Sequence, residues 1–211
     1  MTPPPIQTLE LSDRSRLDEA AAVLAETFRD APQFATIWAN KARRERLLPA
    51  FFRVALEDAL RHGHVSVALE DERAVGVAVW LPPGRAAMTP GRQARAALPL
   101  LRIALADPRA FPRLAKLGSV IDAAHPKEPH WYLVALGVSS EKRGQGVGSR
   151  LVGEGLGRSE RTGYGCYLET MLEPNVRLYE KHGFSVIRYE EHLLPGGPPF
   201  WFMWRPAQGG R

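Results

Sequence analysis

Short apolar runs are the most regular feature of this sequence, and they predict its strands. They occur at residues 6–11, 64–70, 74–81, 130–138, 166–170, 184–194 and 200–206. Many are rich in Val, Phe, Trp or Tyr, and polar turns such as EDER and PGGPP separate neighbouring runs. This composition is typical of β-strands, some of them joined as hairpins.

Helical periodicity occupies the stretches between these runs. Apolar positions three and four residues apart predict helices over residues 12–30, 41–62, 147–161 and 174–183. Pro49 does not fit a helix interior, so it implies either a kink or a helix that starts there. Residues 91–124 also look helical, although prolines at positions 99, 108 and 112 interrupt the pattern.

The order of these elements predicts the fold class. Helices come early, strands follow, and a strand–helix–strand unit precedes a final hairpin. A chain of 211 residues is long enough to bury a sizeable core as one unit. We therefore expect a single domain over residues 1–211, of α/β or α+β class, with a mixed sheet.

Composition and charge narrow the range of partners. The formal net charge of +5 suits an anionic ligand, but no run of Lys or Arg exceeds two residues, so nucleic acid is not expected. No apolar stretch reaches the roughly 18 residues of a membrane helix, and MTPPPIQTLELSD lacks the features of a signal peptide. The single cysteine, Cys166, excludes an intramolecular disulfide, suits a buried thiol and fits a reducing cytoplasm.

Residues 143–149, RGQGVGS, place three glycines between a strand-like run and a helix. The N–H groups at a helix start lack internal partners, and the helix dipole favours an anion there. Gly144, Gly146 and Gly148 would let the backbone turn sharply and approach a bulky anion, and Arg143 adds a charged donor. The pattern indicates a site for phosphate or pyrophosphate.

Other interpretations of the glycines fit less well. A Walker-type loop requires a lysine after the glycines, and none follows here. A dinucleotide fingerprint counted from Gly144 ends on Ser149 instead of glycine, although Glu169 lies about 20 residues on, where a ribose-binding acid would. A glycine-rich turn that binds nothing is the remaining alternative.

A third pattern, [QR]-x-x-G-x-[GA] directly after a strand ending in Val, fits the loop throughout. It is matched by Arg143, Gly144, Gln145, Gly146, Val147 and Gly148. A second block, LETMLEPNVRLYEKHGF, follows at a suitable distance. Together they resemble the acetyl-coenzyme A (acetyl-CoA) site of the GNAT superfamily of N-acetyltransferases. Residues 125–206 are similar in particular to the puromycin N-acetyltransferase branch, but the first half is too dissimilar to carry over the antibiotic.

The resemblance implies a largely antiparallel sheet in which two strands splay apart, with acetyl-CoA lying across them. The backbone of Leu136 and Val138 would pair with the pantetheine arm, and Gly137 would mark a bulge that opens the strand. The pyrophosphate would lie on the N–H groups of residues 143–149. Arg143 and the Ser149 hydroxyl would assist there.

The same resemblance suggests catalytic groups. A primary amine with a pKa near 10 must lose a proton before it attacks a thioester, and the departing thiolate must gain one. Tyr179 matches the family's general acid, or else is a core aromatic. Glu169 is the candidate base, directly or through a water, or else a salt-bridged strand-end residue; His130 competes with it. Asn175 would bind the cofactor arm or only cap its helix.

The acceptor pocket is expected to include Phe28, Trp80 and Tyr132, although each aromatic equally suits a core. Residues 84–124 separate two strands that are joined closely in a minimal GNAT fold. We expect this insertion to form a helical lid over the acceptor site. His62 and His64 have no acidic or cysteine cluster near them in the sequence, so no metal site is expected.

The leading hypothesis is an N-acetyltransferase that moves an acetyl group from acetyl-CoA to an amine of a small molecule by direct attack on the thioester. Acetylation of a protein lysine or N-terminus is the enzymatic alternative, and a flat acidic groove would favour it over a closed apolar pocket. A coenzyme A-binding sensor without turnover is the alternative of another class. An exposed strand edge and the C-terminal hairpin permit a homodimer, and the fold does not name the acceptor.

Overall fold

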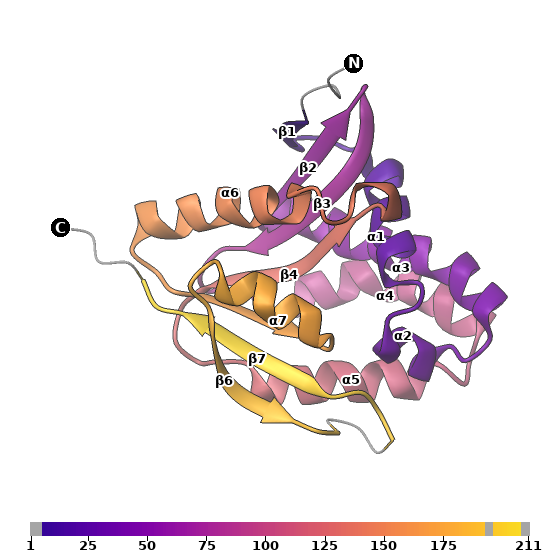
Figure 1. The fold of residues 1–211 in the computed structure, drawn as a ribbon. Helices are drawn as coiled ribbons and strands as arrows, with labels where there is room; N and C mark the ends of the chain where they lie inside the picture. The colour runs from indigo at the N-terminus through magenta and orange to yellow at the C-terminus, as the bar shows by residue number, and fades with distance from the viewer. Residues whose placement is uncertain (1–5, 193–195, 208–211) are drawn as a thin grey trace.

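A computed structural model describes residues 6–192 and 196–207 (Figure 1). Its strands are β1 (Gln7–Glu10), β2 (His64–Glu70), β3 (Arg73–Leu81), β4 (Trp131–Val138), β5 (Cys166–Thr170), β6 (Ser185–Glu190) and β7 (Phe200–Arg205). Its α-helices are α1 (Leu17–Phe28), α2 (Pro32–Ile37), α3 (Lys41–His62), α4 (Pro90–Ala106), α5 (Phe111–Ala124), α6 (Val147–Thr162) and α7 (Glu173–Glu180). The expected extension of β6 over residues 193–194 lies outside the described residues.

The strands form one seven-stranded sheet in the order β1-β2-β3-β4-β5-β7-β6. β4 and β5 run parallel, and every other neighbouring pair is antiparallel. β4 pairs with β5 from Trp131 to Leu133 and then continues to Val138 beside β3. The two central strands therefore splay apart beyond Leu133, which confirms the expected mixed, largely antiparallel sheet with a splayed pair.

A β-bulge lies at the point where the strands separate. Val79 is opposite Ala135 and Trp80 is opposite Leu133, so Val134 is the extra residue in β4. The bulge expected at Gly137 is therefore misplaced. Gly137 instead allows a close approach of α1, because a Cβ there would lie 2.9 Å from Leu24 Cδ2.

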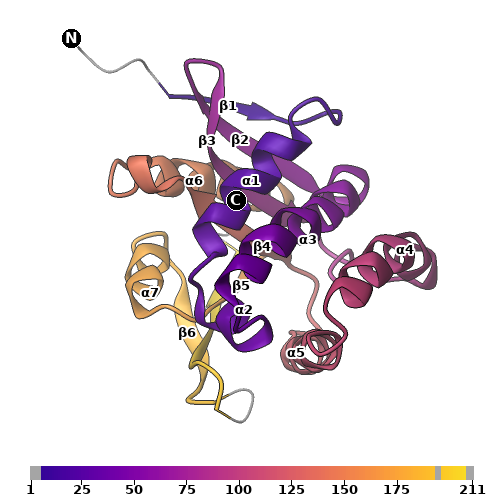
Figure 2. The same cartoon turned by 90° about the vertical axis from the view of Figure 1, so that its right-hand side faces the viewer.

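Helices cover both faces of the sheet and create two separate cores (Figure 2). On one face, α1 and α3 pack with α2, α4 and α5. On the other face, α6 and α7 pack over β3, β4 and β5. Trp80 is fully buried in this second core against Gly155 of α6, where a Cβ would lie 2.1 Å from the indole. The glycine is therefore required for the helix to approach the sheet.

The α3 helix runs without interruption from Lys41 to His62, with Pro49 inside it. Its start is fixed by Asn40, whose side chain accepts a hydrogen bond of 2.9 Å from the Arg43 N–H. The alternative in which the helix begins at Pro49 is therefore wrong.

The insertion between β3 and β4 contains two helices, α4 and α5, and polar contacts fix it to the rest of the fold. Arg92 of α4 is 3% exposed and donates from Nε to Asp58 Oδ1 of α3 at 3.0 Å. Arg43 of α3 pairs with Asp107, at the end of α4, at 3.1 Å. Arg113 of α5 donates to the last carbonyls of α2. The insertion is thus held as a wall against α2 and α3.

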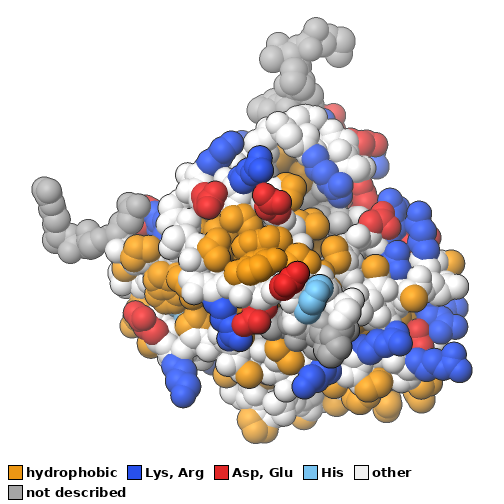
Figure 3. All heavy atoms as spheres, turned by 60° about the horizontal axis from the view of Figure 1, so that its bottom comes forward, with side chains coloured by type: hydrophobic (Ala, Val, Ile, Leu, Met, Phe, Trp, Pro, Cys, Tyr) orange, Lys and Arg blue, Asp and Glu red, His pale blue; other side chains and the backbone are white. Residues whose placement is uncertain are grey.

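β6 forms one edge of the sheet and exposes apolar side chains. Val186, Ile187 and Tyr189 are 39–53% exposed, and Figure 3 shows a molecular face on which hydrophobic side chains gather in a patch surrounded by charged ones. A homodimer through such an edge stays a prediction. Among the described residues, no helix combines the length and apolar character needed to cross a membrane.

Candidate active site

A cavity of about 490 Å³ lies beside the splayed strands. Its floor is β4 from Tyr132 to Leu136, and its sides come from α1, α2, α3, α4, α5 and α7. A volume of this size is ordinary for a small-molecule site. The cavity therefore extends from the gap between β4 and β5 to the helical insertion.

Glu169 lies on β5 just beyond the last residue that pairs with β4. Its side chain is 5% exposed, and it is the one carboxylate among the described residues that line the cavity. Its Oε1 atom is buried and makes no hydrogen bond to any part of the chain that the structure describes. A buried acceptor with no partner is costly, which suits a group that binds a ligand proton.

Two tyrosines and a histidine surround the Glu169 carboxylate. Burial, together with the charge of Glu169, raises the pKa of both Tyr132 and Tyr167. Both hydroxyls therefore stay protonated. His125 lies with Nδ1 3.8 Å from Glu169 Oε1, and its ring contacts both tyrosines with centroids 4.7 and 4.8 Å away.

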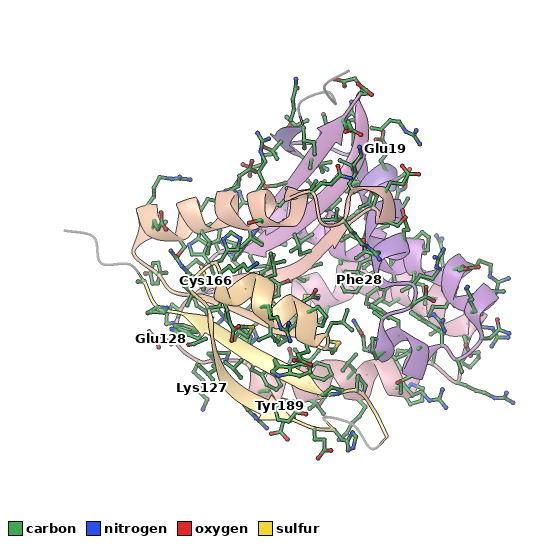
Figure 4. All side chains as sticks on the ribbon, viewed as in Figure 1. Glu19, Phe28, Lys127, Glu128, Cys166 and Tyr189 are labelled. Carbon is green, nitrogen blue, oxygen red and sulfur yellow. The ribbon has the colours of Figure 1, made fainter. Side chains whose placement is uncertain are left out.

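His130 contacts this group through His125. The two Nε2 atoms are 2.9 Å apart, and Nδ1 of His130 lies 2.5 Å from the Glu128 carbonyl oxygen. His130 is 4% exposed, and burial lowers its pKa. His130 does not line the cavity. As a competing base it would therefore have to act through another residue instead of contacting the amine directly. Figure 4 labels Lys127 and Glu128 on the connection between the two histidines.

Tyr179 and Asn175 line the cavity from α7. Burial raises the pKa of Tyr179, so its hydroxyl remains a proton donor. Asn175 lies inside α7, which begins at Glu173, and the N-cap position belongs to Leu172. The alternative in which Asn175 only caps the helix is therefore wrong. Its Nδ2 instead donates to Thr170 Oγ1 at 3.3 Å, which fixes the amide beside the end of β5.

The glycine loop joins β4 to α6. Gly144 and Gly146 have φ angles of 74° and 83°, and Gly146 is the N-cap of α6. These left-handed conformations favour glycine. A Cβ at either position would meet nothing within 4 Å, so the space in front of the helix start is open. The arrangement suits a bulky anion against the N–H groups of the first turn.

The side chains of the loop are already engaged. Arg143 Nε donates to the Val138 carbonyl at 3.3 Å, and Gln145 donates to a loop carbonyl at 2.8 Å. The Ser149 hydroxyl lies 2.7 Å from His182 Nε2. Val147 is 2% exposed, with its side chain in the core. Backbone groups are therefore the part of this loop that is open to a ligand.

The free edge of β4 continues this surface into the cavity. Leu136 lines the cavity, and Gly148 of α6 packs at ordinary van der Waals distance from Val138 and Leu136. The Val138 carbonyl already lies within hydrogen-bond distance of Thr27 Oγ1, at 3.1 Å. The geometry fits a ligand with a diphosphate at α6 and a narrow arm along β4.

Of the three aromatics expected in the acceptor pocket, Phe28 and Tyr132 line the cavity. Phe28 comes from the end of α1 and is labelled in Figure 4. Trp80 does not line it: the indole lies in the core on the other face of the sheet, under α6. Side chains alternate along β3, and the sequence alone does not reveal which face Trp80 takes.

Much of the acceptor side comes from residues that the sequence analysis did not single out as site residues. They are Phe34 of α2, Phe51 and Phe52 of α3, Ile103 of α4, and Phe111, Leu114, Leu117 and Ile121 of α5. Their helical apolar spacing indicated a buried face, but a core and a cavity wall have the same spacing. The sequence around His125 likewise contains no pattern that would place this side chain beside Glu169.

Within the described ranges, no group of three or more His, Cys, Asp or Glu side chains is placed to hold a metal ion. His64 pairs with Glu10, and His62 lies 4.0 Å from Asp58. Cys166 is fully buried, and burial raises the pKa of its thiol, so it is the expected unreactive core residue.

Comparison with known proteins shows the family of the chain and proteins of similar fold. The model of the acetyltransferase (GNAT) family matches residues 26–184. A Corynebacterium glutamicum structure described as "histone acetyltransferase HPA2 and related acetyltransferase" is 25% identical, with a TM-score of 0.69 over 97% of this chain and 98% of that one. Arylalkylamine N-acetyltransferase 2 from Aedes aegypti is 15% identical, with a TM-score of 0.71 over 96% and 99%. An agmatine N-acetyltransferase is 20% identical, with a TM-score of 0.60 over 95% and 98%.

Proposed function

Because the chain belongs to the acetyltransferase (GNAT) family, we propose that it transfers an acetyl group from acetyl-CoA to the amine of a small, largely apolar molecule. The observation that carries the proposal is one cavity lined by Glu169, by Tyr179 and by the free edge of β4. The narrower likeness to the puromycin N-acetyltransferase branch stays a prediction from the sequence.

The residues present fit acetyl-CoA. The open space before α6 suits its pyrophosphate, and the β4 edge at Leu136 suits its pantetheine arm. When bound, it supplies an acetyl group activated as a thioester. We expect the backbone N–H groups from Gly144 to Ser149 to hold the diphosphate, with the helix dipole favouring its charge.

Glu169 is proposed as the general base. It accepts the proton of the entering ammonium, directly or through a water, so that the nitrogen lone pair is free to attack. The amine nitrogen then forms a bond to the carbonyl carbon, and the carbon–sulfur bond breaks. Burial of Oε1 without a hydrogen-bond partner in the described chain supports this role, because a positively charged amine satisfies both the charge and the acceptor.

Tyr179 is proposed as the general acid. Its pKa is raised by burial, so the hydroxyl is protonated before each turnover. It donates a hydrogen bond and then a proton to the departing sulfur. The second proton, which the attacking nitrogen loses as the amide forms, restores the hydroxyl. Asn175, one turn earlier on the same face of α7, also faces the cavity and is positioned to bind the amide groups of the pantetheine arm.

The cavity lining supports a particular class of acceptor. Phenylalanines from α1, α2 and α3 and aliphatic residues from α4 and α5 surround a single carboxylate, Glu169. A second positive charge on the acceptor would be buried against apolar wall without a partner, which is costly. We therefore expect an amine with one cationic group and an aromatic or aliphatic body. The helical insertion would cover this body.

Enzymatic assay of amine-dependent coenzyme A release tests the proposal. Phenethylamine represents the expected class, agmatine a dicationic amine, and a lysine-containing peptide the protein-acetylating alternative. We expect kcat/KM for phenethylamine to exceed that for agmatine by about 10-fold or more, since each buried unpaired charge costs at least 1–3 kcal/mol. Preference for the peptide would support the alternative instead.

Two variants separate an enzyme from a coenzyme A-binding sensor. Glu169→Gln and Tyr179→Phe should each lower kcat by roughly 10²–10⁴-fold, the range for a general acid or base. Calorimetric titration should give an unchanged Kd for acetyl-CoA in Glu169→Gln. If wild type and Tyr179→Phe release coenzyme A equally slowly with every amine, the sensor explanation holds and the enzyme proposal is wrong.

A further inference from the structure

We infer that His125 and His130 form a proton relay that links Glu169 to the surface of the protein. In this relay His125 is a positioning residue, which shares with Glu169 the proton that the base takes up. This inference rests on the proposed function, since it concerns the fate of the proton that Glu169 takes from the amine. It starts from a series of polar atoms leading away from the cavity.

The series consists of one step longer than a hydrogen bond and two steps at hydrogen-bond distance. Glu169 Oε1 lies 3.8 Å from His125 Nδ1, His125 Nε2 lies 2.9 Å from His130 Nε2, and His130 Nδ1 lies 2.5 Å from the Glu128 carbonyl oxygen. Glu128 itself is exposed. The steps therefore lead from the buried carboxylate to a solvent-facing turn between α5 and β4.

The last two contacts fix the positions of the protons. A backbone carbonyl only accepts, so His130 Nδ1 carries a hydrogen. Burial lowers the pKa of His130, so the ring is neutral and its Nε2 is an acceptor. The proton between the two rings therefore belongs to His125 Nε2. In a neutral His125 ring, Nδ1 then presents a lone pair to Glu169 Oε1.

Two acceptors face each other at this point unless one extra proton is present. With that proton, the pair is either a carboxylic acid beside a neutral imidazole or a carboxylate beside an imidazolium. The amine supplies such a proton in every turnover. The Glu169–His125 pair is thus poised to take up one proton and to share it between the two residues.

The balance of the proposed transfer is simple. The incoming proton resides between Oε1 and His125 Nδ1, the hydrogen on His125 Nε2 moves to His130 Nε2, and the hydrogen on His130 Nδ1 leaves at the Glu128 turn. One proton enters and one leaves. Both imidazoles end in the opposite tautomer, and their return to the starting tautomers frees the base for the next ammonium.

Other charged or titratable groups near the relay do not replace it. Tyr132 and Tyr167 face Glu169, but the pKa of each is raised, so they remain neutral donors. The charge of Asp122 on α5 helps to raise the pKa of Tyr132, and the charge of Arg188 on β6 partly opposes the rise in the pKa of Tyr167. Glu128 contributes its carbonyl to His130, and its carboxylate favours the protonated ring.

The pH dependence of kcat/KM for an active amine tests the relay. In wild type, the acidic limb should report the Glu169–His125 pair taking up its proton as one coupled unit. In His125→Gln, the carboxyl lacks the imidazole that shares its proton, so the limb should move to lower pH. We expect kcat to fall roughly 10-fold or more, with the Kd for acetyl-CoA unchanged.

His130→Gln and His62→Gln complete the test. His130→Gln keeps a polar side chain but interrupts the second step, so it should lower kcat and leave the limb close to that of wild type. His62 is outside the cavity lining, and His62→Gln should match wild type in both readings. Should His125→Gln keep the wild-type limb and kcat, the relay is wrong while the proposed function stands; should wild type acetylate no amine, both are wrong.

Discussion

The two sides of the cavity are built by different means. On the side of β4 and α6, the backbone makes the site: glycines in left-handed conformations, a helix start and a splayed strand edge. On the side of α2, α3, α4 and α5, apolar side chains make it, and ion pairs such as Arg92–Asp58 hold the helices in place. A backbone site demands particular residues, whereas a side-chain wall accepts many apolar residues of suitable size.

Gly146→Glu should break the first side with the largest effect. The substitution places a negative charge at the start of α6, where the diphosphate would lie, and forces a side chain into a conformation with φ of 83°. We expect the affinity for acetyl-CoA to fall by roughly 100-fold or more, because like-charge repulsion and strain add. Calorimetric titration measures it.

Two further variants identify the cause. Gly153→Glu puts the same charge on an exposed position of α6 with free space around it, and it should bind acetyl-CoA as wild type does. Gly146→Ala adds the strain without the charge and should cost about 1–2 kcal/mol of stability with a smaller loss of binding. Equal binding by Gly146→Glu and wild type would mean that the diphosphate does not lie at this loop.

Arg92→Met should weaken the attachment of α4 to α3 on the apolar side of the cavity. The arginine is almost fully buried and pairs with Asp58, so its removal leaves a partly buried carboxylate without its main partner. We expect a loss of about 2–3 kcal/mol in the free energy of unfolding, a typical range for charged hydrogen bonds. The melting temperature should fall by roughly 5–10 °C.

The kinetic signature distinguishes the two sides. In Arg92→Met, the KM for the amine should rise by about 10-fold, while the Kd for acetyl-CoA stays constant, because α4 contacts the acceptor part of the cavity. Arg102→Met is a matched control, since Arg102 is exposed on the same helix. An equal rise in the acetyl-CoA Kd would show that the insertion supports both sides.

This contrast also explains what the sequence could reveal. The strand–helix–strand unit around Gly146 was predictable because left-handed glycines at a helix start leave a pattern of fixed spacing. The splayed pair of β4 and β5 followed from the resemblance and is confirmed. The position of the bulge was missed, because Val134 has no local feature that marks an extra residue. Gly137 is required instead for the close approach of α1.

The acceptor side was less predictable. Phe28 and Tyr132, which were expected in the acceptor pocket, line the cavity, and their contact with an acceptor stays a prediction. Trp80 lies in the other core, because an all-apolar strand does not show in its sequence which side chains face which side of the sheet. The insertion was recognised as helical from its apolar spacing. Its docking depends on Arg92 reaching Asp58, which lies 34 residues earlier, and such a contact leaves no periodic signal.

The smallest expected effect concerns His130, which lies where the two sides meet, between α5 and β4. Burial lowers the pKa of His130 in the folded protein below its ordinary value of about 6.5. The unfolded chain therefore binds a proton in a range of pH where the folded chain does not. The stability due to the neutral ring is fully present above about pH 6.5 and is lost as the pH falls below it.

Melting temperatures at about pH 7.5 and 5.5 measure this effect, since the interval spans the ordinary histidine pKa. Wild type should be less stable at the lower pH, and His130→Gln should lose less stability over the same interval. Burial also lowers the pKa of His182, beside Ser149 on the acetyl-CoA side, so His182→Gln is the matched variant. His130 is the more deeply buried ring, and its variant should therefore flatten the pH dependence more. The reverse order would place the stronger pH-dependent coupling at the glycine loop, which would contradict the assignment of the buried proton network to the junction of the two sides.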